Sequence, residues 1–209
     1  SDPIILDRTM EIKAIAIKEG LVDSEIYSSK YIAKVKTPII ALSAGTYTSE
    51  QETSITCATE GAAIHYSLDG STPSTSSPIC SSTIPLTRNA TLKVVATKEG
   101  LEDSEIVSGS YVFQCLPPVF NVPDNQLHNN AQNLRLSTSS SGAKIYYTTD
   151  GTDPTTASSQ YSTTIVLDGN VTVKAATIKD GWNSSDVVTK AYSFKCADPV
   201  FKSESGSYT

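Results

Sequence analysis

Short runs in which apolar and polar residues alternate recur along the chain, with turn residues about every 8 to 12 positions. Between Leu92 and Thr97, for example, Leu92, Val94 and Ala96 alternate with Lys93 and its neighbours. This period of two predicts a half-buried β-strand that points Leu92 inward and Lys93 outward. No stretch combines an apolar period of 3.6 residues with capping residues, so we expect strands and essentially no helix.

Residues 36–114 contain a full set of such runs. Asp-Gly, Glu-Gly and Ala-Gly pairs separate them, as expected for turns. Six or seven short strands at this spacing are typical of a two-layer antiparallel sandwich. The predicted strands are 38–48, 53–58, 64–68, a short one around Ile84 and Leu86, 92–97 and 105–113.

The whole pattern repeats along the chain. KAIAIKEG from Lys13 returns as KVVATKEG from Lys93 and as KAATIKDG from Lys174, at spacings of 80 and 81 residues. HYSLDGSTP from His65 returns as YYTTDGTDP from Tyr146. A period of this length exceeds that of solenoid repeats and fits one small sandwich domain per repeat.

The period divides the chain into four parts. Residues 1–35 are the C-terminal half of a repeat, 36–114 and 115–195 are complete β-sandwich repeats, and 196–209 are the first strand of a following repeat. The two partial repeats cannot complete each other, because neither contains a counterpart of residues 49–80. Since bare sheet edges and apolar faces are unstable, we expect the chain to be a window on a longer array.

Composition agrees with this all-β interpretation and limits the partners. Ser and Thr make up 55 of 209 residues, while charged residues make up only 18%. A net charge of −6 and a pI near 4.9 argue against binding to nucleic acid or to anionic membranes. No apolar stretch approaches the ~20 residues that would span a bilayer.

Two motifs carry a resemblance to a known family. YSLDGSTP from Tyr66 and KEGLEDSE from Lys98, in the order of the whole repeat, are similar to the chitobiase/β-hexosaminidase C-terminal type domain. The resemblance covers both complete repeats and both partial ones. It implies tandem immunoglobulin-like or fibronectin-III-like antiparallel β-sandwiches, and a non-catalytic module found on sugar-cleaving enzymes and in surface proteins. The third repeat departs at Asn125, where the second has Gly45; Asn tolerates a left-handed turn.

Candidate catalytic and metal-binding residues are scarce. His65 and His128 have no Cys or His at ligand spacing, and His65 falls on the outward side of its strand. Neither a nucleophile elbow, a phosphate loop nor a paired acid and base stands out. Asp69–Pro73 and Asp150–Pro154 could in principle hold calcium, but Asp and Gly are ordinary turn formers there. We therefore predict no catalytic residue, metal or cofactor, and not an enzyme.

Glycosylation sequons are the best-supported functional motif. Asn89-Ala90-Thr91 and Asn170-Val171-Thr172 occupy the same repeat position, in the turn before a strand, and Asn183-Ser184-Ser185 is a third sequon. In a chain this rich in Ser and Thr, chance is the alternative explanation. The Ser/Thr/Pro-rich segment 71–82 is a further candidate for O-linked glycans.

Four cysteines in a β-rich chain without metal motifs favour an oxidising, extracellular setting. Cys57 and Cys80 share a repeat, so a disulfide between them is one hypothesis. Cys115 and Cys196 are repeat equivalents about one domain length apart, on the order of 30 Å, and so cannot pair within one chain. We expect these two at domain junctions, facing other repeats or chains; buried free thiols are the alternative.

Trp182 is the only tryptophan and follows the Asp180-Gly181 turn. An exposed ring there could stack on a sugar, which makes it a candidate carbohydrate contact. Leu21 and Leu101 hold the same position in the other repeats, which favours a packing role instead. The recurring tyrosines of the final strand are interpreted as core residues; these are Tyr31, Tyr111 and Tyr192.

These observations favour a non-catalytic structural array of an extracellular or cell-surface protein. Short, proline-containing linkers would make the array a semi-rigid, glycosylated filament, appendage or adhesin stalk. Its expected partners are neighbouring repeats or copies of itself, with glycans as further candidates. The alternative is a carbohydrate-binding or spacer module of a glycoside hydrolase.

Overall fold

The computed structural model describes residue 4 and residues 8–196, which form strands and turns but no helix. Contacts divide the chain into two compact units, Ser1–Val112 and Phe113–Thr209. The all-β prediction is confirmed for the described residues, and each unit is considered by itself below.

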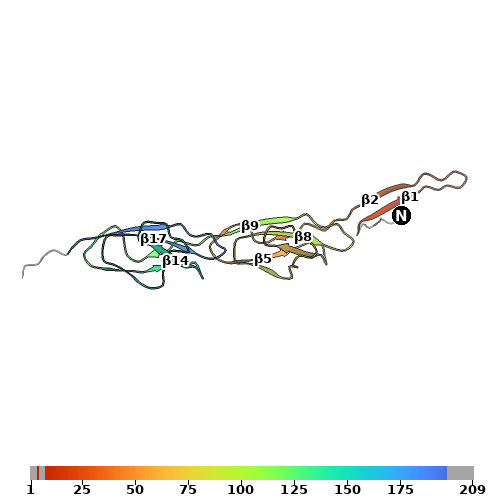
Figure 1. Cartoon of the computed structure of the whole chain (residues 1–209). Helices are drawn as coiled ribbons and strands as arrows, with labels where there is room; N and C mark the ends of the chain where they lie inside the picture. Colours follow the sequence, from red (N-terminus) through yellow and green to blue (C-terminus); the bar gives the residue numbers. More distant parts are fainter. Residues whose placement is uncertain (1–3, 5–7, 197–209) are drawn as a thin grey trace, which may run out of the picture. The chain divides into compact units, whose positions relative to one another are not determined.

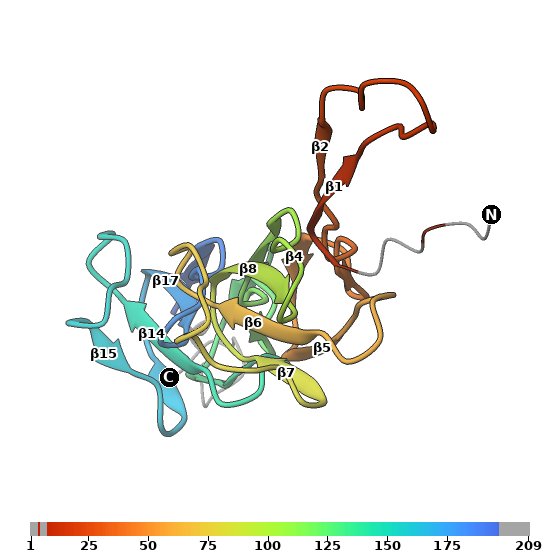
Figure 2. The same cartoon turned by 90° about the vertical axis from the view of Figure 1, so that its right-hand side faces the viewer.

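Within the described part of the first unit, nine strands succeed one another (Figures 1 and 2). The last residue of the ninth strand begins the second unit. The strands are β1 (Met10–Ala14), β2 (Tyr27–Tyr31), β3 (Ile39–Ile40), β4 (Gly45–Tyr47), β5 (Gln51–Thr56), β6 (Ala63–Ser67), β7 (Thr83–Leu86), β8 (Ala90–Thr97) and β9 (Val107–Phe113).

Two sheets form the sandwich of this unit. One has the strand order β4-β9-β8-β6 and the other β3-β5-β7, while β1 and β2 pair only with each other. Figure 2 shows β6 beside β8, and β5 beside β7. The pairs β6–β8, β8–β9, β3–β5 and β5–β7 are all antiparallel, which confirms the predicted sandwich.

The predicted first strand, 38–48, is divided between the two sheets. Its first part, β3, pairs with β5, whereas its second part, β4, lies beside β9 in the other sheet. The chain crosses between the sheets at the bends of residues 41–44. Alternation of side chains cannot reveal such a crossing, because both halves keep the strand period.

The core lies between the two sheets and follows the predicted alternation. Leu92, Val94 and Ala96 of β8 are fully buried, and Leu86 of β7 faces the same interior. The phenol of Tyr111 is also buried, and its hydroxyl donates a hydrogen bond to the Leu42 carbonyl oxygen at 2.8 Å. This bond ties the last strand of the sandwich to the segment between β3 and β4.

The second unit repeats this plan within the part of the chain that the structure describes. One sheet has the order β11-β18-β17-β14-β15, and two short pairs, β10–β13 and β12–β16, form the opposite layer. Its strands are β10 (Val119–Phe120), β11 (Leu127–His128), β12 (Gln132–Leu134), β13 (Leu136–Ser137), β14 (Lys144–Thr148), β15 (Ser159–Gln160), β16 (Ile165–Leu167), β17 (Val171–Ile178) and β18 (Val188–Phe194).

The second core also contains a buried tyrosine whose hydroxyl is hydrogen-bonded to a backbone carbonyl oxygen, an arrangement here called a latched tyrosine. Tyr192 is buried with Leu134, Val173 and Ile145, and its hydroxyl donates to the Val122 carbonyl oxygen at 3.2 Å. Asn125 and its counterpart Gly45 both have negative φ angles, so neither turn needs the left-handed conformation expected from the sequence.

His65 is not on the surface, contrary to the prediction from strand alternation. The segment that follows β6 folds back along it, and Tyr66 N donates to the Pro78 carbonyl oxygen at 3.0 Å. The His65 ring is therefore buried, with Nδ1 lying 3.1 Å from the Ser77 carbonyl oxygen. The Ser/Thr/Pro-rich segment acts partly as a cover for the outer face of β6.

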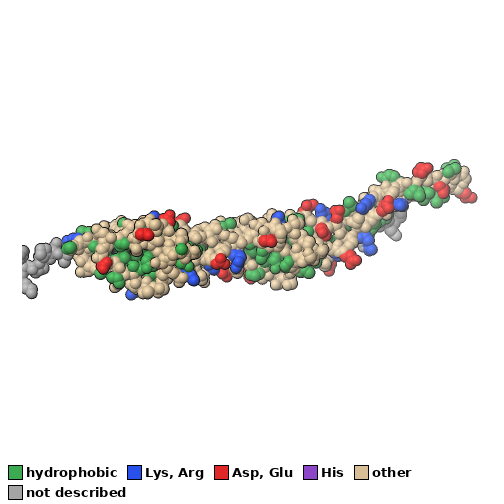
Figure 3. Space-filling view, in the orientation of Figure 1, with side chains coloured by type: hydrophobic (Ala, Val, Ile, Leu, Met, Phe, Trp, Pro, Cys, Tyr) green, Lys and Arg blue, Asp and Glu red, His purple; other side chains and the backbone are tan. Residues whose placement is uncertain are grey.

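The hairpin of β1 and β2 leaves much apolar surface exposed. Leu21, Val22 and Tyr27 are all exposed, and Tyr31 is far more exposed than its repeat equivalent Tyr111. Hydrophobic side chains are visible at the surface of this hairpin in Figure 3. The hairpin corresponds to β8 and β9, which in the complete repeat are covered by a second sheet.

Candidate functional site

The two equivalent sequon turns lie at equivalent places in the two sandwiches. Asn89 connects β7 to β8, Asn170 connects β16 to β17, and both side chains are exposed. Asn170 Oδ1 accepts a hydrogen bond from the Phe194 backbone N–H at 2.7 Å. The side-chain oxygen makes this bond, whereas N-glycosylation modifies the nitrogen.

A shallow cavity of about 370 Å³ adjoins the first sequon turn. Its lining is mostly apolar and includes Leu68, Pro85 and Ala90 together with Asn89 itself. A sugar attached to Asn89 would therefore have an apolar surface next to its attachment point.

The third sequon has a different environment. Asn183 is exposed, but Ser185, the hydroxyl residue of this sequon, is buried. Ser185 Oγ accepts a hydrogen bond from the Thr177 backbone N–H at 2.8 Å and donates to the Asp186 carbonyl oxygen at 2.9 Å. The Ser185 hydroxyl is thus part of the turn structure in the folded domain.

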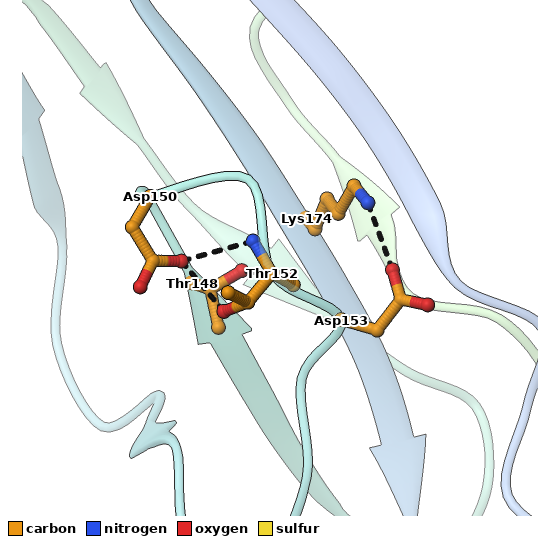
Figure 4. Close-up of polar contacts among 5 residues, drawn as sticks. All are labelled: Thr148, Asp150, Thr152, Asp153 and Lys174. Carbon is orange, nitrogen blue, oxygen red and sulfur yellow. Dashed lines mark hydrogen bonds and ion pairs between the residues drawn. The ribbon is translucent and has the colours of Figure 1, made fainter.

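The Asp-Gly turns are closed by their own side chains (Figure 4). Asp150 Oδ1 accepts hydrogen bonds from Thr152 N at 3.0 Å and Thr152 Oγ1 at 2.6 Å, and Asp69 is bound in the same way by Ser71. These hydrogen bonds hold the pKa of both Asp69 and Asp150 below the usual value. Asp153 instead pairs with Lys174 at 2.8 Å.

Over the described residues, no cluster of three or more His, Cys, Asp or Glu could hold a metal ion. The same part of the chain contains no helix long and apolar enough to cross a membrane. In the view of Figure 3, charged side chains of both signs are scattered rather than gathered into one patch.

All four cysteines are free thiols in the structure, which therefore does not confirm the hypothesised Cys57–Cys80 disulfide. Cys57 follows β5 and donates to the Lys36 carbonyl oxygen, whereas the backbone of Cys80 pairs with Ile64 in the opposite sheet. The sequence places both in one repeat but cannot show that they belong to different layers.

Cys115 and Cys196 hold the same repeat position but differ in exposure. Cys115 is only 1% exposed, and burial raises the pKa of its thiol, so this cysteine is not available to another chain. Cys196 is exposed.

Trp182 is a packing residue in the structure, as the alternative interpretation held. Its side chain is 8% exposed, and its ring lies 5.1 Å from that of Phe113. The Lys179 ammonium lies 4.2 Å from the ring centroid, over the indole. Little of the ring is left for a sugar to stack on, which argues against Trp182 as a carbohydrate contact.

The second sandwich also contains an ion pair that the sequence pattern did not predict. Lys190 Nζ lies 2.9 Å from Asp124 Oδ1, and both side chains are partly buried. The hydrogen bond from Lys190 holds the pKa of Asp124 below its usual value. The second repeat has Gly109 in place of Lys190, so comparing the repeats gave no signal for this pair.

The repeated two-sheet sandwiches, with their latched tyrosine and exposed turns, define an immunoglobulin-like or fibronectin-III-like tandem protein. The model of one family, the chitobiase/beta-hexosaminidase C-terminal domain, matches residues 42–108 and 123–189. The chain belongs to this family, which consists of accessory non-catalytic modules, and the comparisons show no catalytic family. No curated protein matches the chain.

Several solved structures are similar to the chain at low identity. Fibronectin(III)-like modules of Clostridium thermocellum CbhA share 15% identity over 81% of this chain and 100% of theirs, with a TM-score of 0.30. Domains 7, 8 and 9 of the S-layer protein SbsC share 11% over 92% of this chain and 72% of theirs, with a TM-score of 0.32. The BSP domain of a biofilm-associated protein shares 15% identity over 78% of this chain and 30% of its own chain, with a TM-score of 0.27.

Proposed function

We propose that this chain is a segment of an extracellular or cell-surface array of sandwich domains that builds a semi-rigid filament, appendage or adhesin stalk. The repeats run over 1–35, 36–114, 115–195 and 196–209, and the partners are neighbouring repeats or copies of the protein. The observation that carries this proposal is the repetition of a whole sandwich, including its latch and turns, without a cluster of reactive side chains among the described residues.

Negative-stain imaging of the native material tests the array. We expect regular filaments with an axial repeat of a few tens of Å, the size of one domain of this length. Dispersed single particles in the native material would contradict the filament proposal.

Glycosylation of Asn89 and Asn170 is the second part of the proposal. Both are exposed in turns, so we expect mass spectrometry of protein from its native source to find sugar at both asparagines, and less at Asn183. Asn89→Gln and Asn170→Gln should each remove the mass of one glycan. Unmodified peptides at both positions would show that the sequons are unused.

An accessory module of a glycoside hydrolase is the alternative, because the family takes its name from a domain of sugar-cleaving enzymes. The complete gene distinguishes the two proposals. Many further repeats would support an array, whereas a neighbouring catalytic domain would support the accessory module. A glycan array separates a carbohydrate-binding module from a pure spacer, which should bind nothing.

A further inference from the structure

The cavity beside Asn89 lies where the two sheets of the first sandwich end. Leu68 follows β6, the edge strand of one sheet, and Pro85 belongs to β7, an edge strand of the other. Both residues line the cavity of about 370 Å³, together with Ala90 and Asn89 itself. Leu68 and Pro85 are both exposed. An apolar surface, here called the shelf, is thus open to solvent directly beside the sequon asparagine.

Two charged residues complete the lining that concerns us. The Arg88 guanidinium offers several N–H donors, and the Asp69 carboxylate offers acceptor oxygens. Asp69 Oδ1 accepts hydrogen bonds from the backbone and the hydroxyl of Ser71, which fixes the orientation of the carboxylate. An apolar surface with a few polar groups is the usual composition of a site for a small molecule, and such sites have volumes of roughly 300–1,000 Å³.

A second cavity continues the groove away from the sequon. It has a volume of about 400 Å³, shares Leu68 and Asp69 with the first cavity, and adds Tyr66 and Pro78 to the lining. The apolar lining therefore extends from Asn89 past Leu68 to an aromatic ring. A chain of more than one sugar starting at Asn89 would have surface to follow.

The second repeat keeps the sequon but changes the residues around it. Thr149 stands at the position of Leu68, and Gly169 stands at the position of Arg88. Asn170 is therefore an asparagine in the same turn without the leucine and the arginine. This difference allows the contribution of the shelf to be separated from that of a sugar alone.

We propose that the shelf binds the first sugar of an N-linked glycan on Asn89, with the carbon–hydrogen face of the ring on Leu68 and Pro85. In a eukaryotic glycan this sugar is N-acetylglucosamine, whose hydroxyl and amide groups can pair with Arg88 and Asp69. Asn89 lines the cavity, so a sugar bonded to its Nδ2 is held at a high effective concentration beside the shelf. The inference rests on the proposed glycosylation of Asn89 and specifies what the sugar does there.

This contact is expected to stabilise the first sandwich. Covering Leu68 and Pro85 with the carbon–hydrogen face of a sugar removes apolar surface from water. In a domain of about 80 residues, a contact of this size shifts the midpoint of thermal unfolding by several degrees. We therefore expect the sugar to raise the midpoint of this unit by about 4 °C.

A cycle of four chains isolates the part of Leu68. All four carry Asn170→Gln and Asn183→Gln and are made in a eukaryotic host, and an endoglycosidase trims the glycan to one N-acetylglucosamine on Asn89. The cycle combines Leu68 or Leu68→Thr with glycosylated Asn89 or Asn89→Gln. Leu68→Thr copies Thr149 of the second repeat, and because Leu68 is exposed the variant should remain folded.

Scanning calorimetry measures the effect of the sugar in each pair of chains. We expect a rise of about 4 °C with Leu68 and of less than about 1 °C with Leu68→Thr. Trp182 fluorescence identifies the transition of the second unit, which should not move. Ile79→Thr is the matched control: Ile79 is 60% exposed in the same unit and lines neither cavity, so the full effect of the sugar should persist.

Nuclear Overhauser contacts give a readout that does not depend on stability. Ring protons of the sugar on Asn89 should show contacts to the methyl groups of Leu68. In a chain that keeps the sequon at Asn170, the sugar there should show no contact to the methyl group of Thr149.

An equal effect of the sugar with Leu68 and with Leu68→Thr, or no contact between the sugar and Leu68, would overturn the proposal. So would a host that leaves Asn89 unmodified. Binding of free N-acetylglucosamine to the Asn89→Gln chain with a Kd below about 1 mM would assign the groove to a free carbohydrate instead. Because the host supplies the sugar, an unmodified Asn89 in the native material would reject the proposed glycosylation while the measured contact with the shelf would stand.

Discussion

Leu92→Ala is expected to lower the free energy of unfolding of the first sandwich by about 2–5 kcal/mol. Leu92 is fully buried in β8, between the two sheets, and its methyl groups would be replaced by a cavity. A domain of about 80 residues buries a modest share of its surface and has little stability to spare. The variant should therefore leave this sandwich largely unfolded under mild denaturing conditions.

Urea unfolding followed by circular dichroism and by tryptophan fluorescence measures this effect. Trp182 lies in the second unit, so its fluorescence should report on that unit and keep its midpoint. Ile79→Ala is the control, because Ile79 is 60% exposed and its truncation should change stability by less than about 0.5 kcal/mol. A Trp182 transition that shifts as far as the circular dichroism transition would show that the two cores unfold as one.

Raising the pH from 10 to 12 is expected to destabilise the second sandwich by about 2 kcal/mol through Tyr192. Burial raises the pKa of the Tyr192 phenol to about 12, and the nearby charge of Asp124 adds to the shift. The folded state therefore holds this proton more tightly than the unfolded state does. The stabilisation is complete below the unfolded pKa of about 10 and is lost as the pH rises through about 12.

Tyr192→Phe is the variant that isolates this effect, since lysines also lose their charge in the same pH range. It should cost about 1–3 kcal/mol at neutral pH, because the Val122 carbonyl oxygen loses its donor. Between pH 10 and 12 the variant should lose less stability than the native chain, as judged by Trp182 fluorescence. Tyr111→Phe, in the first unit, should leave that difference unchanged. Parallel pH curves for the native chain and Tyr192→Phe would contradict the assignment.

Alternation along single strands predicted the fold well where neighbouring strands supply the burial. Leu92, Val94 and Ala96 point inward as their spacing requires. Alternation failed where burial comes from elsewhere in the chain. His65 lies on the outer side of β6 and is covered by a loop, which the period of two cannot show.

The sequence predicted which asparagines of the candidate site are exposed, but it did not predict which residues from distant parts of the chain lie in the same layer. Asn89 and Asn170 are exposed because turn residues before a strand usually are. The Cys57–Cys80 hypothesis depended on which sheet each cysteine joins, and the crossing of the chain between layers decides that. Trp182 showed its packing role through Leu21 and Leu101, the apolar residues at its position in the other repeats.

The pairing of β11 with β18 has a consequence for an array under tension. These strands lie near the entry to and exit from the second sandwich, and they run parallel, with Leu127 opposite Ser193 and His128 opposite Phe194. Pulling on the two sides of the domain draws the strands in opposite directions along their own axes. Their hydrogen bonds are then sheared together instead of opening one after another, so a stretched chain would resist extension at this pair before the rest of the sandwich separates.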